Sequence, residues 1–165
     1  MGFDKSLLNF YGEPQVNWLY HLLQSFCEKV FVSGVQDKVG GGFNFIPDHF
    51  DSGGPMNGIL SAFRVHPSVA WLVVPVDMPH VDDAVLKFLL SHRDETKPAT
   101  CFLNPDGNLI EPFPVIVEPK AYAMLLQRFN QNEDSLTGFL KTIPHAHIMA
   151  PDSTWFINVN KPEQL

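Results

Sequence analysis

The sequence is poor in cysteine and contains no long apolar run. Its 165 residues include two cysteines, Cys27 and Cys101, which stand far apart rather than in a CxxC pair. This pattern argues against a disulfide framework or a zinc site and favours a reducing compartment. No apolar stretch approaches the length of a membrane span, and the first residues lack a signal-peptide core. We therefore expect a cytoplasmic protein with no membrane partner.

Positive charge is also scarce. Eleven Lys and Arg residues face 18 Asp and Glu residues, which gives a formal net charge of −7. Without a basic cluster to neutralise phosphates, a nucleic-acid partner is disfavoured. A small phosphorylated ligand held through a divalent metal ion remains compatible with this charge.

The composition is that of an ordinary globular chain. Hydrophobic residues make up 45% of the sequence and charged residues 18%, which argues against disorder. The length fits one domain with a real core, and we expect a single domain over 1–165. The prolines and glycines are spread along the chain and punctuate it as turns.

Apolar spacing predicts alternating helices and strands. Helices are expected at 14–30, 54–67, 81–93, 121–129 and 135–143, with a terminal one starting in 161–165. Strands are expected at 30–34, 43–48, 69–77, 147–150 and 155–160, and 99–119 resembles a hairpin around the turn NPDGN. Such an order predicts a three-layer α/β fold with a mainly parallel sheet and one antiparallel hairpin.

The stretch VAWLVVPVDMP ends a fully apolar run with Asp77, between Pro75 and Pro79. The run reads as a strand buried on both faces, and ligands of α/β sheets bind beyond the carboxyl ends of strands. Asp77 could simply cap the next helix. However, the flanking prolines stiffen the loop, which suits a carboxylate that meets a metal ion in fixed geometry.

Two further segments could meet a nucleotide. GGPMNGIL places small residues before a helix, where backbone N–H groups can approach an acceptor. No GK[ST] follows, so it is not a Walker A loop. Lys5, in MGFDK, would suit a triphosphate as a mobile point charge, although a lone lysine is by default only solvated.

Taken together, MGFDK, GGPMNGIL, PVDMP and INVNKPEQL resemble the molybdenum cofactor guanylyltransferase family over nearly the whole chain. The motifs are jointly specific at this separation, although none is specific alone. The resemblance implies a Rossmann-like nucleotidyltransferase fold. It also implies transfer of GMP from GTP to molybdopterin with Mg²⁺, and release of pyrophosphate. Other molybdenum cofactor biosynthesis proteins and molybdoenzymes would be its partners.

The resemblance also implies site residues. Asp77 would bind the metal and the nucleotide phosphates, and Lys5 would bind GTP phosphate. Asp48 matches a nucleotide-binding aspartate, with Asp51 a close alternative in register. The loop against the nucleotide would be formed by Gly54, Pro55 and Gly58. A polar nucleotide contact near Ser33 is also a family feature, but the register there does not assign it.

The sequence departs from the family at its start. Relatives place a strand and a glycine-rich loop before the segment that matches MGFDK, so the domain is expected to be N-terminally truncated relative to them. A mis-assigned start codon and a naturally short, impaired protein are both compatible with this, and the first is favoured. The chain as given is expected to bind GTP poorly and to have unpaired backbone edges.

Other interpretations stay open. A cytidylyl- or sugar-phosphate nucleotidyltransferase of the same fold is one, and a non-catalytic accessory module is another. The loop GPMNG favours guanine over cytosine, because the cytidine-using relatives lack it. A second departure is Glu111, where relatives carry a less acidic residue; it is expected to point away from an anionic substrate.

Overall fold

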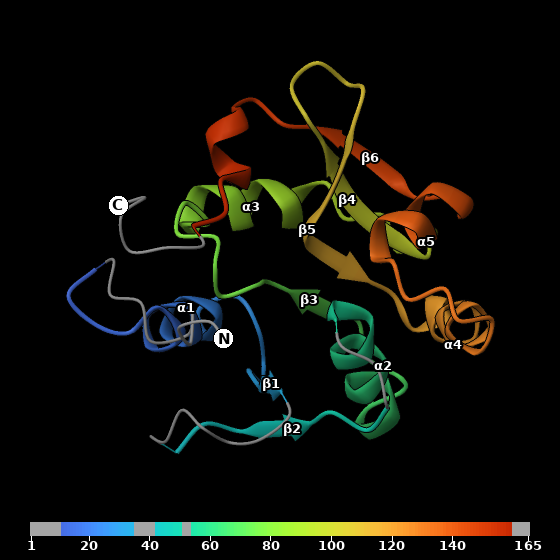
Figure 1. Ribbon diagram of the computed structural model, residues 1–165. Coiled ribbons are helices and arrows are strands. Elements are labelled where there is room, and N and C mark those ends of the chain that lie inside the picture. Colours follow the sequence, from blue (N-terminus) through green and yellow to red (C-terminus); the bar gives the residue numbers. More distant parts are fainter. Residues whose placement is uncertain (1–10, 35–41, 51–53, 160–165) are drawn as a thin grey trace.

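The computed structural model describes residues 11–34, 42–50 and 54–159 and shows an α/β fold (Figure 1). The α-helices in this part are α1 (Gln15–Gln24), α2 (Pro55–Val65), α3 (Asp83–Ser91), α4 (Tyr122–Asn130) and α5 (Leu136–Thr142). The strands are β1 (Val32–Gly34), β2 (Phe45–Pro47), β3 (Trp71–Val73), β4 (Ala99–Leu103), β5 (Ile110–Val117) and β6 (Ala146–Met149). Two short 3-10 helices are η2 (Pro119–Ala121) and η3 (Ser153–Phe156).

The strands form two sheets in the described part of the chain. β1 and β2 pair in parallel, and the other sheet has the order β3-β5-β4-β6. Within the second sheet β3, β4 and β6 share one direction, and β5 runs against them. The expected hairpin is therefore confirmed as β4–β5. Its turn is closed by the side-chain oxygen of Asn104, which accepts from the backbone N–H groups of Asn108 at 2.9 Å and Leu109 at 3.1 Å.

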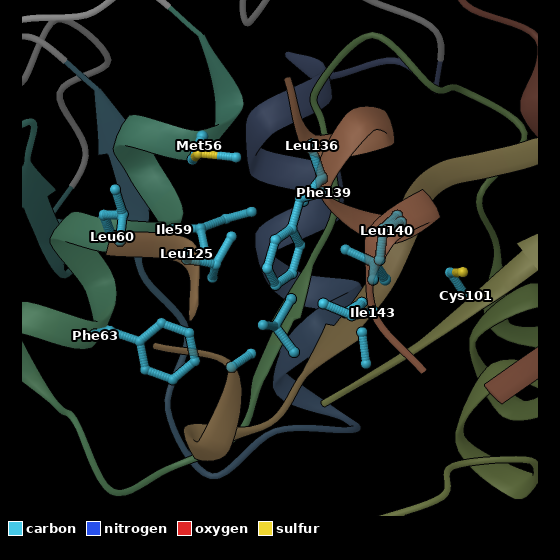
Figure 2. Close-up of a cluster of buried hydrophobic side chains, with 14 residues drawn as sticks. Met56, Ile59, Leu60, Phe63, Cys101, Leu125, Leu136, Phe139, Leu140 and Ile143 are labelled. Carbon is cyan, nitrogen blue, oxygen red and sulfur yellow. The ribbon is translucent and has the colours of Figure 1, made fainter. Parts of the chain in front are cut away.

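Alternating residues of β4 and β5 pack against helices on both faces of the sheet. Val115 and Val117 contact a core cluster contributed mainly by α2, α4 and α5, which Figure 2 shows. Ile116, between them, contacts the opposite cluster, which contains the buried residues of α3 and partly buried residues of α1 and η3. Because successive side chains of a strand point to opposite faces, these two clusters define the helix–sheet–helix arrangement. The three-layer α/β prediction is confirmed.

The prediction of a strand at 155–160 is wrong for residues 155–159, which the structure describes and which contain no strand. Trp155 and Phe156 belong to η3, which begins where the Asp152 carboxylate accepts from the backbone N–H of Thr154 at 2.8 Å. Both aromatic rings pack on Phe102, with centroid distances of 5.8 and 5.5 Å. An aromatic pair suits a strand by composition, but the aspartate cap starts a helical turn instead. The helix expected in 161–165 lies outside the described residues.

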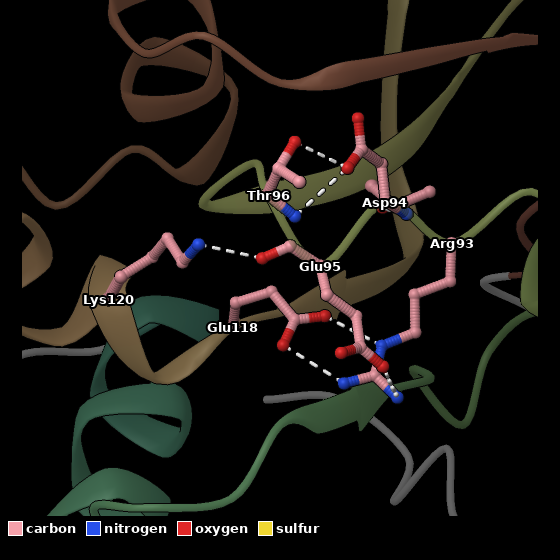
Figure 3. A network of polar contacts seen from close by, with 7 residues as sticks. Arg93, Asp94, Glu95, Thr96, Glu118 and Lys120 are labelled. Carbon is pink, nitrogen blue, oxygen red and sulfur yellow. Dashed lines mark hydrogen bonds and ion pairs between the residues drawn. The ribbon is translucent and has the colours of Figure 1, made fainter.

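A polar network joins the ends of α3 and β5 (Figure 3). The guanidinium of Arg93 donates to both carboxylate oxygens of Glu118, at 2.7 and 3.0 Å. The Glu118 side chain is only 5% exposed, whereas that of Arg93 is 32% exposed. Lys120 donates to the backbone oxygen of Glu95 at 2.7 Å and fastens the adjoining loop. These contacts hold the loop after α3 against the end of β5. The buried carboxylate of Glu118 depends on the positive charge of Arg93 to offset the cost of its burial.

Both cysteines are free thiols, and Cys101 is buried in β4. Burial raises the pKa of the Cys101 thiol to about 12, so it is un-ionised and unreactive near neutral pH. None of the helices in the described ranges has the length and apolar character that crossing a membrane requires.

Candidate functional site

A cavity of about 610 Å³ opens where β1, β2 and β3 end and α2 begins. We call it the site cavity. It brings together Asp48, Gly54, Pro55, Gly58 and Asp77. All the site residues that the sequence suggested therefore line one cavity, except Lys5, which lies outside the described residues together with the alternative Asp51.

Asp48 is held at the end of β2 by its neighbour strand. Its backbone N–H donates to the carbonyl of Gly34 at 2.9 Å, which extends the β1–β2 ladder by one residue. Burial raises the pKa of the Asp48 carboxyl, and the nearby His49 and a hydrogen bond from Ser33 partly offset that rise. Ser33 pairs with Ile46, and Asp48 lies two residues after Ile46, so the parallel ladder places the side chains of Ser33 and Asp48 on the same face.

The glycine loop enters α2 in a conformation that only glycine adopts easily. Gly54 has φ 136°, and Pro55 follows as the first helical residue. Among the described residues, no side-chain hydrogen bond caps this helix end. The buried Asn57 ties the preceding chain to the helix, because its amide donates to the carbonyl of Phe50 at 2.6 Å. The first turn of α2 thus presents backbone N–H groups and positive dipole to the cavity.

Gly58 of α2 packs closely against Ser33 of β1. A Cβ at position 58 would lie 3.0 Å from Ser33 Oγ and 3.7 Å from Ser33 Cβ. Gly58→Ala gains helix propensity of about 1 kcal/mol but meets the hydroxyl, so we expect nearly unchanged stability in the native background. When Ser33→Ala removes the hydroxyl, the same change should stabilise the fold by about 1 kcal/mol.

Urea unfolding of the native protein, the two single variants and the double variant measures the interaction energy between positions 58 and 33. Gly34→Ala is the matched control, because a Cβ there meets nothing within 4 Å. Simple additivity of the Gly58 and Ser33 changes would contradict the close contact.

Asp77 lies in the loop that leads from β3 towards α3, and this loop is held from two distant segments. Its backbone carbonyl accepts from the N–H of Val159 at 2.9 Å. Two residues later, the carbonyl of Pro79 accepts from the hydroxyl of Tyr11 at 2.6 Å. Tyr11 in turn stacks on Trp18 of α1, with ring centroids 4.3 Å apart. Two long-range hydrogen bonds therefore hold the backbone of the loop that carries the Asp77 carboxylate, and we call this loop braced.

The cavity also contains polar residues that the sequence did not assign. Ser33 had been considered without a firm register, and Asn158 lies in the INVNKPEQL motif that supported the resemblance. Glu111, expected to point away from an anionic substrate, instead lines the cavity, which is a correction. It lies near the start of β5, next to Pro112 and Phe113, which also line the cavity, and burial raises the pKa of its carboxyl.

The donor atoms of the site cavity suit a hard cation. Its oxygen-bearing side chains include carboxylates, hydroxyls and an amide, from Asp48, Asp77, Glu111, Ser33, Tyr20 and Asn158. In the described ranges, no three or more His, Cys, Asp or Glu side chains gather as a ready metal cage. Mg²⁺ needs no such cage, because it keeps waters and takes one or two carboxylates together with substrate phosphates. The oxygen donors present fit that cation.

A three-layer α/β fold that gathers carboxylates and a glycine loop at its strand ends defines the class of Rossmann-like nucleotide-binding proteins. A solved structure of this fold confirms the architecture. The molybdopterin-guanine dinucleotide biosynthesis protein A from Archaeoglobus fulgidus superposes with a TM-score of 0.79 over 98% of this chain and 87% of that chain, at 19% identity.

The chain belongs to the MobA-like NTP transferase domain family, whose sequence model matches residues 1–148. A molybdenum cofactor guanylyltransferase from Xanthomonas euvesicatoria pv. vesicatoria is 30% identical over 99% of this chain and 85% of its own length. A molybdenum cofactor biosynthesis bifunctional protein from Synechocystis is 29% identical over 99% of this chain, which spans 48% of that relative. The family resemblance seen in the motifs is confirmed.

Proposed function

We propose that this chain transfers GMP from GTP to the terminal phosphate of molybdopterin. The observation that carries the proposal is the joint placement of Asp48, Asp77 and the α2 glycine loop around one cavity. The 30% identical relative named a molybdenum cofactor guanylyltransferase supports the choice of substrate pair. Other molybdenum cofactor biosynthesis proteins and molybdoenzymes would then be partners, and two free thiols suit a cytoplasmic setting.

The reaction is a phosphoryl-centred substitution. An oxygen of the molybdopterin phosphate forms a bond to the α-phosphorus of GTP, and the bond from that phosphorus to the oxygen bridging to the β-phosphate breaks. Pyrophosphate leaves with that electron pair. Because the attacking atom already carries negative charge, the protein needs no nucleophile of its own. Positioning and charge neutralisation are its tasks.

Each site residue takes a defined task in this proposal. Asp77, in the loop between β3 and α3, would hold a divalent cation, and Lys5 neutralises phosphate charge. Asp48, held by Ser33 and the β1–β2 ladder, accepts from polar groups of the nucleoside. The N–H groups of the first turn of α2 meet acceptor atoms of the nucleotide, and the small residues Gly54 and Gly58 let it approach the backbone.

A bound Mg²⁺ would supply Lewis-acid stabilisation of the phosphate charge. Asp77 would hold it, with water and phosphate completing its ligands. Glu111 would disfavour an anion beside it when ionised, and burial raises the pKa of its carboxyl.

A nucleotide comparison tests the proposal. Pyrophosphate release should depend on molybdopterin and Mg²⁺, and kcat/KM for GTP should exceed that for CTP or ATP by about 100-fold or more, because hydrogen-bonded base sites discriminate strongly. Preference for CTP would reject the guanine assignment in favour of a cytidylyltransferase. Tight GTP binding without any turnover would favour the accessory module.

A further inference from the structure

Two histidines lie side by side at the edge of the four-stranded sheet, away from the site cavity. β6 ends the order β3-β5-β4-β6, whereas Asp77 follows β3 at the other edge (Figure 1). His145 directly precedes β6, and His147 lies within it. Their imidazole rings are stacked, with centroids 4.0 Å apart and 27° between the ring planes. We call these two residues the histidine pair.

Strand alternation puts both rings on the same face of β6. Ile148 and Ala150 pack into the core cluster that contains α3, so residues 145 and 147 face the other way. Side chains two residues apart on a strand start roughly 7 Å from each other, and both can reach an atom between them. His147 is exposed and His145 is half-buried, so an ion from solvent can reach the pair.

The hydrogen bonding of His145 leaves one ring nitrogen available. Its Nδ1 lies 3.0 Å from the carbonyl oxygen of Ile143. Because a carbonyl only accepts, Nδ1 carries the proton, and Nε2 of the neutral ring keeps its lone pair. Nε2 is buried and makes no hydrogen bond in the described part of the chain, although buried polar atoms nearly always have a partner. Metal-binding histidines typically donate their other ring N–H to a backbone carbonyl in this way.

His147 can supply a second nitrogen without a change in the backbone. Its ring is exposed, and exposed side chains change rotamer readily. A metal–nitrogen bond is about 2.0–2.1 Å long, so two nitrogens on neighbouring corners of one ion stand about 3 Å apart. The stacked rings are already close to that separation. Burial and the neighbouring His145 also lower the pKa of His147, which favours the neutral ring that a metal ion requires.

The histidine pair offers two ligands rather than a complete cage. Within the described ranges, no third Cys, Asp or Glu joins it in a metal-binding group. Cys101 pairs with His147 in the β4–β6 ladder, but its thiol is buried in the core and has a pKa of about 12. Water would therefore fill the remaining positions around an ion. Imidazole ligands suit transition metals, and among the divalent ions of the first row Cu²⁺ binds such sites most tightly.

We propose that His145 and His147 chelate one divalent transition metal ion through an imidazole nitrogen of each ring, with Cu²⁺ bound most tightly. β6 runs in the same direction as β3, so the entry of β6 lies at the opposite end of the sheet from the Asp77 loop. Neither histidine lines the site cavity. The ion is therefore separate from the Mg²⁺ of the proposed transfer reaction, and the inference does not depend on the nucleotide chemistry.

Titration of the intact chain with CuCl₂ tests the proposal by calorimetry and electron paramagnetic resonance. One tight ion should bind per chain, and its spectrum should show two nitrogen donors. His145→Ala and His147→Ala should each weaken binding about tenfold or more, because even the loss of a residue that only orients a ligand weakens metal binding by about that factor. His92→Ala is the matched control, since it removes another exposed histidine and should leave the affinity unchanged.

Competition with Mg²⁺ separates the histidine pair from the carboxylates of the site cavity. Excess Mg²⁺ should leave the Cu²⁺ affinity unchanged, because this hard cation prefers oxygen ligands, and Zn²⁺ should bind more weakly than Cu²⁺. His147 is exposed, so His147→Ala should fold, which circular dichroism checks. Native Cu²⁺ affinity in the variant that lacks both imidazoles, or displacement of Cu²⁺ by Mg²⁺, would overturn the proposal.

Discussion

Asp77→Asn should lower GTP turnover by about 100- to 1000-fold and weaken Mg²⁺-dependent GTP binding about tenfold or more. The change keeps the size of the side chain and the backbone carbonyl that accepts from Val159. It removes the negative charge through which the loop would hold a divalent cation, and such charge stabilisation is a large part of phosphoryl-transfer catalysis.

Steady-state pyrophosphate release and calorimetry with and without Mg²⁺ measure these two effects. Asp106→Asn is the matched control, since Asp106 is exposed in the β4–β5 turn and should change neither value. If Asp77→Asn kept native turnover and native Mg²⁺ dependence, the metal role of Asp77 would be wrong, while the fold assignment would stand.

Arg93→Ala should destabilise the fold by about 3 kcal/mol. The substitution leaves the carboxylate of Glu118 buried without its bidentate partner, and an uncompensated buried charge is costly. Because the Arg93 side chain is partly exposed, water can reach the site after the substitution, which limits the loss of stability to about this value. Chemical unfolding monitored by circular dichroism measures it.

Two comparisons separate charge burial from a general loss of packing. Lys87→Ala breaks an exposed pair with Asp83 on α3 and should cost at most about 0.5 kcal/mol. Adding Glu118→Gln to Arg93→Ala should recover part of the loss, because a neutral amide is cheaper to bury than a carboxylate. A double variant as unstable as Arg93→Ala alone would contradict this explanation.

Most of the fold could be predicted because its elements carry local signals. The helical spacing at 54–67 and the Asp82 cap, whose carboxylate accepts from Val85 N–H at 3.0 Å, give α2 and α3 directly. The apolar run that ends at Asp77 gave a strand, although regular pairing stops at Val73. The pattern WFINVN was misread because its aspartate cap outweighs its strand-like composition.

The candidate site was predictable only where topology brings strand ends together. Asp48 and Asp77 follow strands, so a parallel arrangement predicts that they converge. Ser33 was not assigned, since its importance lies in a contact with Gly58 from a different element. Glu111 was misplaced because the sequence alone does not show which face of β5 borders the cavity. Asn158 comes from a segment far along the chain, and its only signal was the shared motif.

The bracing of the Asp77 loop has a consequence for how the molecule reaches its native state. The contact from Tyr11 to the carbonyl of Pro79 spans 68 positions, and the one from Val159 arrives from beyond every strand of the sheet. Contacts of such long range close slowly, because chain entropy is lost before they form. The loop that carries Asp77 should therefore reach its native conformation last during refolding, after the β4–β5 hairpin and the helices packed on it have formed.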